Sequence, residues 1–176
     1  EGAGAKPLHP RPGLPHAVSM IPTLLLPTLL VQAPAPDPKP VQAVLDDWHR
    51  AAAQADEARY FGHLAEDSVF MGTDATERWD KKAFQASAHP YFAKGKAWSF
   101  KAVRRSVMFS PDGATAWFDE DLDTPNMWPC RGTGVLSLQQ GRWVIRHYNL
   151  TVPIPNDLMN EVKGRIAAHL KKAEAK

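Results

Sequence analysis

The sequence has little of several features that would point to a particular class of protein. Its 176 residues include a single cysteine, Cys130, so no internal disulfide can form and no cysteine-based zinc site can be assembled. The formal net charge is only +2, and the basic residues form no run, whereas a nucleic-acid-binding protein usually carries a basic stripe. We therefore expect no nucleic-acid partner and no bound metal.

Glycine-rich and nucleophile motifs are also missing. The sequence contains no phosphate loop and no Gly-x-Ser-x-Gly, and the pair Gly132 and Gly134 lacks the third glycine and the helix of a dinucleotide-binding fingerprint. These absences predict a protein that works without a cofactor.

Proline is scarce after residue 40. Ten of the 16 prolines fall in residues 1–40, where they prevent regular helix or sheet, so the folded domain is expected over residues 41–176. The one strongly apolar stretch, residues 18–31, is too short for a membrane-spanning helix, which needs about 20 residues. We expect no stable membrane insertion.

That stretch has the outline of a secretory signal peptide. Lys6 and Arg11 precede it, small residues follow it, and residues 34–40 then form a Pro-rich spacer. A signal would make the protein secreted or periplasmic, and otherwise it is cytoplasmic. The alternatives are a tail without function, or a native start at Met20.

The rest of the chain predicts an α+β domain. Apolar residues at helical spacing from Val41 to Ala52 indicate a first helix, Asp56 and Asp80 can cap two more, and Asn156 a last one. A short strand is expected at residues 68–72. Two turns, at residues 110–113 and 139–142, each join a pair of strands: 99–109 with 115–123, and 131–138 with 143–152.

This order, together with several segments, resembles the nuclear transport factor 2-like superfamily and, within it, the uncharacterised SnoaL-like proteins of bacteria. The segments are residues 70–79, 109–120, 130–136 and 141–150, and the Gly-x-Trp-x-Ile that opens the last of them is fairly specific for the fold, though not for any activity. The resemblance implies a curved antiparallel sheet wrapped on N-terminal helices, which forms a cone with an internal pocket, plus a C-terminal helix. It does not imply one activity, because this fold hosts enzymes, binding modules and assembly domains.

Glu120 is the first candidate for chemistry in such a pocket. It lies in a strand with Asp119 and Asp121, and alternation places it on the same face as the apolar Phe118 and Leu122. A buried carboxylate has a raised pKa, so Glu120 could transfer protons; alternatively it neutralises Arg131. The neighbouring aspartates are expected to be solvated.

The last strand supplies further candidates. Alternation from Trp143 and Ile145 predicts that His147 and Asn149 face the pocket, where His147 could act as a general base and Asn149 could orient a ligand. Arg131 could clamp a carboxylate there or pair with an inward carboxylate of the neighbouring strand. Structural roles remain open for all three.

Polar residues of the loop after the first strand are the remaining candidates. Asp74, Glu77 and Trp79 could line the pocket mouth, or Asp74 and Glu77 could form only local contacts. Cys130 lacks a partner that lowers its pKa, which argues against a nucleophilic thiol.

Three functions follow as hypotheses. The first is cofactor-independent acid–base chemistry of the isomerase, cyclase or hydratase type on a small apolar or mixed-polarity molecule. The second is non-catalytic ligand binding, with the pocket's polar groups already paired. The third is homodimerisation through the outer sheet face, to which Trp117 and Tyr148 would contribute if they point outward.

Overall fold

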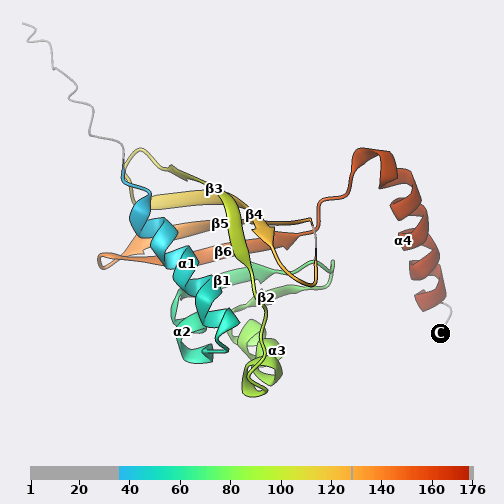
Figure 1. Cartoon of the computed structure of the whole chain (residues 1–176), viewed down its shortest axis with the longest axis horizontal. Helices are drawn as coiled ribbons and strands as arrows, with labels where there is room; N and C mark the ends of the chain where they lie inside the picture. Colours follow the sequence, from blue (N-terminus) through green and yellow to red (C-terminus); the bar gives the residue numbers. More distant parts are fainter. Residues whose placement is uncertain (1–35, 128, 175–176) are drawn as a thin grey trace, which may run out of the picture. The chain divides into compact units, whose positions relative to one another are not determined.

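The computed structural model describes residues 36–127 and 129–174 (Figure 1). Its elements follow the order α1 (Lys39–Ala53), α2 (Glu57–Gly62), β1 (Leu64–Met71), β2 (Arg78–Asp80), α3 (Lys81–Ala93), β3 (Lys101–Phe109), β4 (Thr115–Asp123), β5 (Cys130–Gln139), β6 (Arg142–Thr151), a 3-10 turn η1 (Asn156–Leu158) and α4 (Met159–Glu174). The predicted α+β class is confirmed. The signal expected at residues 18–31 lies outside the described residues and stays a prediction.

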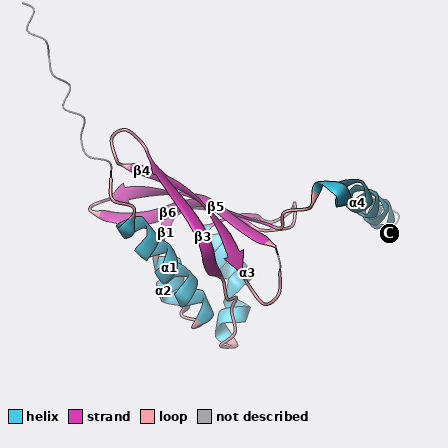
Figure 2. Ribbon diagram, turned by 45° about the horizontal axis from the view of Figure 1, so that its top comes forward, coloured by secondary structure: helices cyan, strands magenta, loops and turns pink. Residues whose placement is uncertain are grey.

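One curved sheet carries the domain. Its strand order is β2-β1-β6-β5-β4-β3, and every pair is antiparallel except β1 with β6. The parallel pair is a departure from the all-antiparallel expectation. Helices α1, α2 and α3 lie on one face of the sheet (Figure 2). The core therefore forms between these helices and the inner face.

Helix α1 supplies the centre of that core. Val41, Leu45 and Trp48 recur on one side of the helix and are almost completely buried. The helix begins two residues earlier than expected and has Pro40 in its first turn, which is where a helix tolerates proline because the N–H has no helical partner.

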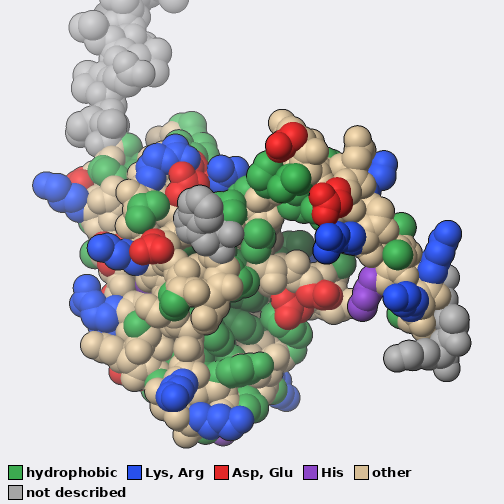
Figure 3. All heavy atoms as spheres, turned by 45° about the vertical axis from the view of Figure 1, so that its right-hand side comes forward, with side chains coloured by type: hydrophobic (Ala, Val, Ile, Leu, Met, Phe, Trp, Pro, Cys, Tyr) green, Lys and Arg blue, Asp and Glu red, His purple; other side chains and the backbone are tan. Residues whose placement is uncertain are grey.

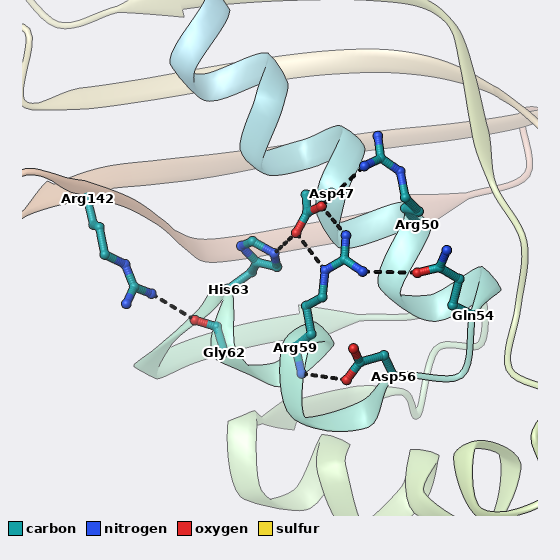
Figure 4. Close-up of polar contacts among 8 residues, drawn as sticks. All are labelled: Asp47, Arg50, Gln54, Asp56, Arg59, Gly62, His63 and Arg142. Carbon is teal, nitrogen blue, oxygen red and sulfur yellow. Dashed lines mark hydrogen bonds and ion pairs between the residues drawn. The ribbon is translucent and has the colours of Figure 1, made fainter.

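A polar cluster joins α1 to α2 (Figure 4). Asp47 of α1 accepts hydrogen bonds from Arg59 Nε of α2 at 2.9 Å and from His63 Nε2 at 2.9 Å, just before β1 begins. Asp56 caps α2 by accepting from the Arg59 backbone N–H at 3.1 Å, as expected from the sequence. The cluster fixes the chain where it turns from the helices into the sheet.

The two turns predicted from the sequence are present, but some strand ends differ. The Gly113 N–H donates to Ser110 O at 2.9 Å, and Gly141 adopts a φ of 79°, which suits glycine. Strand β1 begins at Leu64, four residues before the strand expected from residue 68, and Trp79 lies in β2, where a loop was expected. The polar segment after β1 is thus the turn of a hairpin.

A β-bulge in β6 changes which side chains face the core. Val135 of β5 pairs with His147, but the next residue, Leu136, pairs with Ile145, so Arg146 is an extra residue in β6. Trp143 and Ile145 face inward as predicted, but beyond Ile145 the extra residue reverses the predicted alternation of inward and outward side chains. Tyr148 points inward and is buried, and His147 lies on the opposite face.

The C-terminal helix α4 is amphipathic but exposed. Apolar side chains recur every four residues along η1 and α4, at Leu158, Val162, Ile166 and Leu170. All of them except Val162 are about half exposed. The cap expected from Asn156 is not formed; η1 begins at this residue. No helix in the described ranges is long and apolar enough to span a membrane.

Candidate functional site

An aromatic cavity of about 320 Å³ lies between the helices and the inner face of the sheet. Figure 3 shows hydrophobic side chains gathered on one face of the domain. The lining comes from α1, α2, both strands and the turn of the first hairpin, α3 and the segment after it, the β4–β5 loop and β6. Its members are Trp48, Tyr60, Phe70, Gly72, Thr73, Glu77, Trp79, Phe84, Ser87, Ala88, Tyr91, Trp98, Phe100, Met127, Tyr148 and Leu150.

The aromatic rings pack mainly as parallel pairs around Phe84. The ring centroids of Phe70 and Phe84 are 3.9 Å apart with an interplanar angle of 15°, and Trp79 and Trp98 also stack on Phe84 at 5.8 and 6.0 Å. A lining rich in such rings suits a planar or apolar molecule.

Glu120 lies next to this cavity, behind Tyr148, and does not line it. The Tyr148 hydroxyl donates to Glu120 Oε1 at 3.2 Å. Two further donors hold the carboxylate: His49 Nε2 at 2.8 Å from Oε1 and Arg105 Nε at 2.8 Å from Oε2. The side chain of Glu120 is 0% exposed, so the structure confirms that it points inward.

The environment of Glu120 keeps it ionised. Burial acts to raise its pKa, but the hydrogen bond from His49 and the electrostatic influence of His49 and Arg105 outweigh burial, so the pKa is lowered. The expectation of a raised pKa is therefore wrong, because it left out these partners. Burial, reinforced by the charge of Glu120, raises the pKa of Tyr148 well above its usual value, so Tyr148 is a neutral phenol that gives its proton to the hydrogen bond.

Gly132 of β5 makes room for this contact. A Cβ added at Gly132 would lie 2.8 Å from Tyr148 Cζ and 2.9 Å from Glu120 Oε1, both closer than side chains tolerate. On the same face, Gly134 leaves space for the ring of Phe118. The two glycines, which form no nucleotide-binding loop, allow large side chains of neighbouring strands to meet over β5.

Two of the predicted loop residues line the cavity and one does not. Glu77 and Trp79 are half-buried in its wall. Asp74 is exposed and holds the β1–β2 turn by accepting from the Thr76 hydroxyl at 2.6 Å and from the Thr76 N–H at 2.8 Å, and these two hydrogen bonds lower its pKa. Of the two roles considered for Asp74, the structure therefore shows local contacts and not a place in the cavity wall.

Three predicted pocket residues lie outside the cavity. His147 and Asn149 are on the outer face because of the bulge at Arg146. Arg131 is exposed, since its neighbours Cys130 and Gly132 take the inner face of β5. Its Nε lies 3.4 Å from Asp121 Oδ1, so it pairs with a carboxylate of the neighbouring strand, but on the outer face and not with the inward Glu120.

Sequence reasoning missed the partners of Glu120. His49 follows Leu45 by four residues, and Arg105 is set opposite Glu120 by the β3–β4 register, so both positions could have been found. Tyr148 was expected to point outward, and no feature of the sequence announces the bulge that turns it inward.

Neither a metal centre nor a reactive thiol is evident in the described part of the chain. No group of three His, Cys, Asp or Glu side chains there could hold a metal ion. Cys130 is buried, and burial raises the pKa of its thiol, which disfavours the nucleophilic thiolate.

A family model described as SnoaL-like domain matches residues 41–155. The chain belongs to this family. The match covers the helices α1 to α3 and the whole sheet of the SnoaL-like domain, and it stops before η1 and α4. A comparison with curated proteins finds no match.

Solved structures show the same fold at low sequence identity. A nuclear transport factor 2-like protein of unknown function from Pseudomonas putida KT2440 has a TM-score of 0.54 and 16% identity, over 66% of this chain and 86% of the other. A protein named provisionally as a scytalone dehydratase, from Novosphingobium aromaticivorans, has a TM-score of 0.55 and 9% identity, over 66% of this chain and 83% of the other. A protein named provisionally as a calcium/calmodulin-dependent protein kinase II association domain, from Xanthomonas campestris, has a TM-score of 0.52 and 19% identity, over 69% of this chain and 90% of the other. These identities establish the fold alone, which is nuclear transport factor 2-like.

Proposed function

We propose that the SnoaL-like domain binds a small, mostly apolar molecule in its aromatic cavity. The observation that carries this proposal is that the two sides of Tyr148 have different surroundings. The ionisable groups behind it are paired with one another, while the cavity in front is lined by rings. A volume of about 320 Å³ is at the lower end of ligand pockets and accommodates a bicyclic molecule.

An unpartnered polar atom supports a ligand with at least one polar group. Among the described residues, no hydrogen-bond partner is found for the Trp48 indole nitrogen, which is buried beside the cavity. An unsatisfied buried donor costs about 1–3 kcal/mol, which a ligand acceptor could recover after a small movement.

Binding of 1-methylnaphthalene, followed by isothermal titration or by the tryptophan indole signals in NMR, tests the proposal. Ser87 lines the mouth of the cavity, and its neighbour Ala86 is exposed on α3 without lining it. Ser87→Trp is expected to weaken binding at least tenfold, and the matched control Ala86→Trp to change it less than twofold. Absence of binding to the unmodified protein, or equal effects of the two variants, would contradict the proposal.

Acid–base catalysis is a second candidate, supported by the contact between Tyr148 and Glu120. A proton leaving a bound molecule could pass to the Tyr148 oxygen while the phenol proton passes to Glu120 Oε1, 3.2 Å away. Glu120 in turn contacts His49, which also lines a separate pocket near the start of β3 and so connects the buried carboxylate with the surface.

Deuterium exchange into 2-tetralone in D2O, measured by NMR, tests this candidate, because its acidic C–H bonds need only a base. We expect the protein to accelerate exchange and Tyr148→Phe to abolish the acceleration while binding persists. Equal exchange with the two proteins would leave binding as the function and exclude the relay.

We also propose homodimerisation through the outer sheet face. The register places Met108, Trp117, Val135 and His147 in one row across β3 to β6, and Trp117 is 43% exposed. The association-domain name of one structural neighbour supports assembly through this fold. Tyr148, expected on this face, is buried inside instead. Sedimentation equilibrium should show a dimer that Trp117→Glu dissociates; a monomer at 100 μM would contradict it.

A further inference from the structure

The charge of the cavity lining is of one sign. Of the 16 described residues that line it, Glu77 alone carries a formal charge, and no Lys, Arg or His is among them. Arg105 and His49 lie nearby, but both are engaged by Glu120, and Arg105 also by Asp46 at 2.7 Å. A bound molecule therefore meets one carboxylate and no free positive charge from the lining.

The aromatic residues of the lining also favour a positively charged ligand. Nine of the lining residues are aromatic, and the rings around Phe84 lie nearly parallel, with an interplanar angle of 12° to Trp79 and 22° to Trp98. The face of an aromatic ring carries a negative quadrupole, so flat ring surfaces attract a cation, most strongly those of tryptophan. Three tryptophans and three tyrosines line this cavity.

The carboxylate is held in place at the turn that leads from β1 to β2. Glu77 Oε2 accepts from the Asp74 N–H at 3.1 Å, and its backbone oxygen accepts from the Gly72 N–H at 2.9 Å. The Glu77 side chain lies over Gly72, where a Cβ would overlap it. Glu77 is thus a fixed counter-charge two residues before Trp79, which lines the same cavity.

We propose that this cavity selects organic cations, with the positive charge between the Glu77 carboxylate and the aromatic walls. The ligand class is a planar or compact amine or quaternary ammonium with an apolar body. This inference rests on the proposed binding function and names the charge of the ligand. Anionic molecules are disfavoured because the lining offers them no positive charge and places a carboxylate near them.

A charge series of similar shape tests the inference by titration calorimetry on the full chain. The probes are 1-methylquinolinium (positive), 1-methylnaphthalene (neutral) and 1-naphthoate (negative). We expect the cation to bind about tenfold more tightly than its neutral counterpart, and the anion more weakly than both.

Variants at Glu77 separate charge from shape. Glu77→Gln keeps the oxygen that accepts from the Asp74 N–H and is expected to weaken cation binding five- to tenfold, while binding of 1-methylnaphthalene changes less than twofold. Glu66→Gln is the matched control, since Glu66 is exposed and lies outside the aromatic cavity. It should leave all three affinities unchanged.

The outcomes distinguish this inference from the function on which it rests. If 1-methylnaphthalene or 1-naphthoate binds as tightly as 1-methylquinolinium, the cavity binds ligands but the selectivity is overturned. Equal loss of cation binding in the variants at Glu77 and Glu66 also overturns it. If none of the three probes binds, the proposed function fails together with the inference.

Discussion

Arg105 and Glu120 face each other across the β3–β4 hairpin, and the guanidinium Nε lies 2.8 Å from Glu120 Oε2. The side chains are 7% and 0% exposed. Arg105 continues to α1, where it donates to Gln42 O at 3.3 Å and Asp46 Oδ1 at 2.7 Å. One ion pair therefore holds the first helix on the sheet and fixes the carboxylate behind Tyr148.

Arg105→Met is expected to destabilise the domain strongly. It leaves a buried carboxylate without its main cation, and removing one partner of a buried pair costs about 3–5 kcal/mol. The neighbouring Arg104 is the matched control: it pairs with Asp121 on the outer face, where its side chain is 60% exposed. Arg104→Met should cost less than about 1 kcal/mol. Urea unfolding followed by circular dichroism measures both, and equal losses would show that the buried pair has no special role.

Gly132→Ala is expected to disturb the floor of the pocket. The new methyl group would overlap Tyr148 and approach Glu120 Oε1 to 2.9 Å, and overpacking of this kind costs about 1–3 kcal/mol. Gly164 in α4 has no atom within 4 Å of an added Cβ, so Gly164→Ala should stabilise the helix by up to about 1 kcal/mol. Thermal unfolding of the two variants should shift in opposite directions; a harmless Gly132→Ala would contradict the packing described here.

Part of this site follows from the sequence by simple counting. The turn at residues 110–113 places Phe109 opposite Ala116, and continuing that register brings Arg105 opposite Glu120. Alternation with Phe118 then places Glu120 inside. Local turn chemistry and strand geometry are sufficient here because no irregularity lies between the turn and the pair.

The other half of the site does not follow in this way. The turn at residues 139–142 also sets a register, but the bulge at Arg146 breaks it, so that Tyr148 rather than His147 faces the core. A bulge depends on how β6 fits between β5 and the parallel strand β1, which is a long-range property. The pocket lining likewise brings together helices and strands far apart in the chain, so Trp48 and Tyr60 carry no local sign of a shared cavity.

Cys130 is expected to resist thiol reagents in the folded protein. It is 3% exposed, and burial raises the pKa of its thiol, so little thiolate is present at neutral pH. Reaction with 5,5′-dithiobis(2-nitrobenzoate) at pH 8 should be at least about 100-fold slower in the native state than in 6 M guanidinium, consistent with exposure only on opening. Native and denatured rates of similar size would place the thiol at the surface.

Asp47 predicts a specific loss of stability in acid. The hydrogen bond from Arg59 is the largest influence on its pKa; burial opposes it, His63 adds to it, and the pKa falls well below the usual value. A carboxylate whose pKa is lower in the folded than in the unfolded state stabilises the fold above the unfolded pKa of about 3.9, and this contribution is lost as the pH falls below that value. Three groups face it: Arg59 of α2, His63 between α2 and β1, and Arg50 of α1 itself.

Asp47→Asn removes this titration. The variant should be about 1–2 kcal/mol less stable at pH 7, since it loses charge-assisted hydrogen bonds at a partly exposed site. The difference from the unmodified protein should shrink as the pH is lowered from 5 towards 2, because the Asp47 carboxylate of the unfolded chain takes up a proton in this range while that of the folded protein stays ionised. Asp123, exposed at the end of β4, provides the control Asp123→Asn. Unfolding free energies measured across this range test the cluster, and a difference at Asp47 that does not change with pH would show that its charge does not hold α2 against α1.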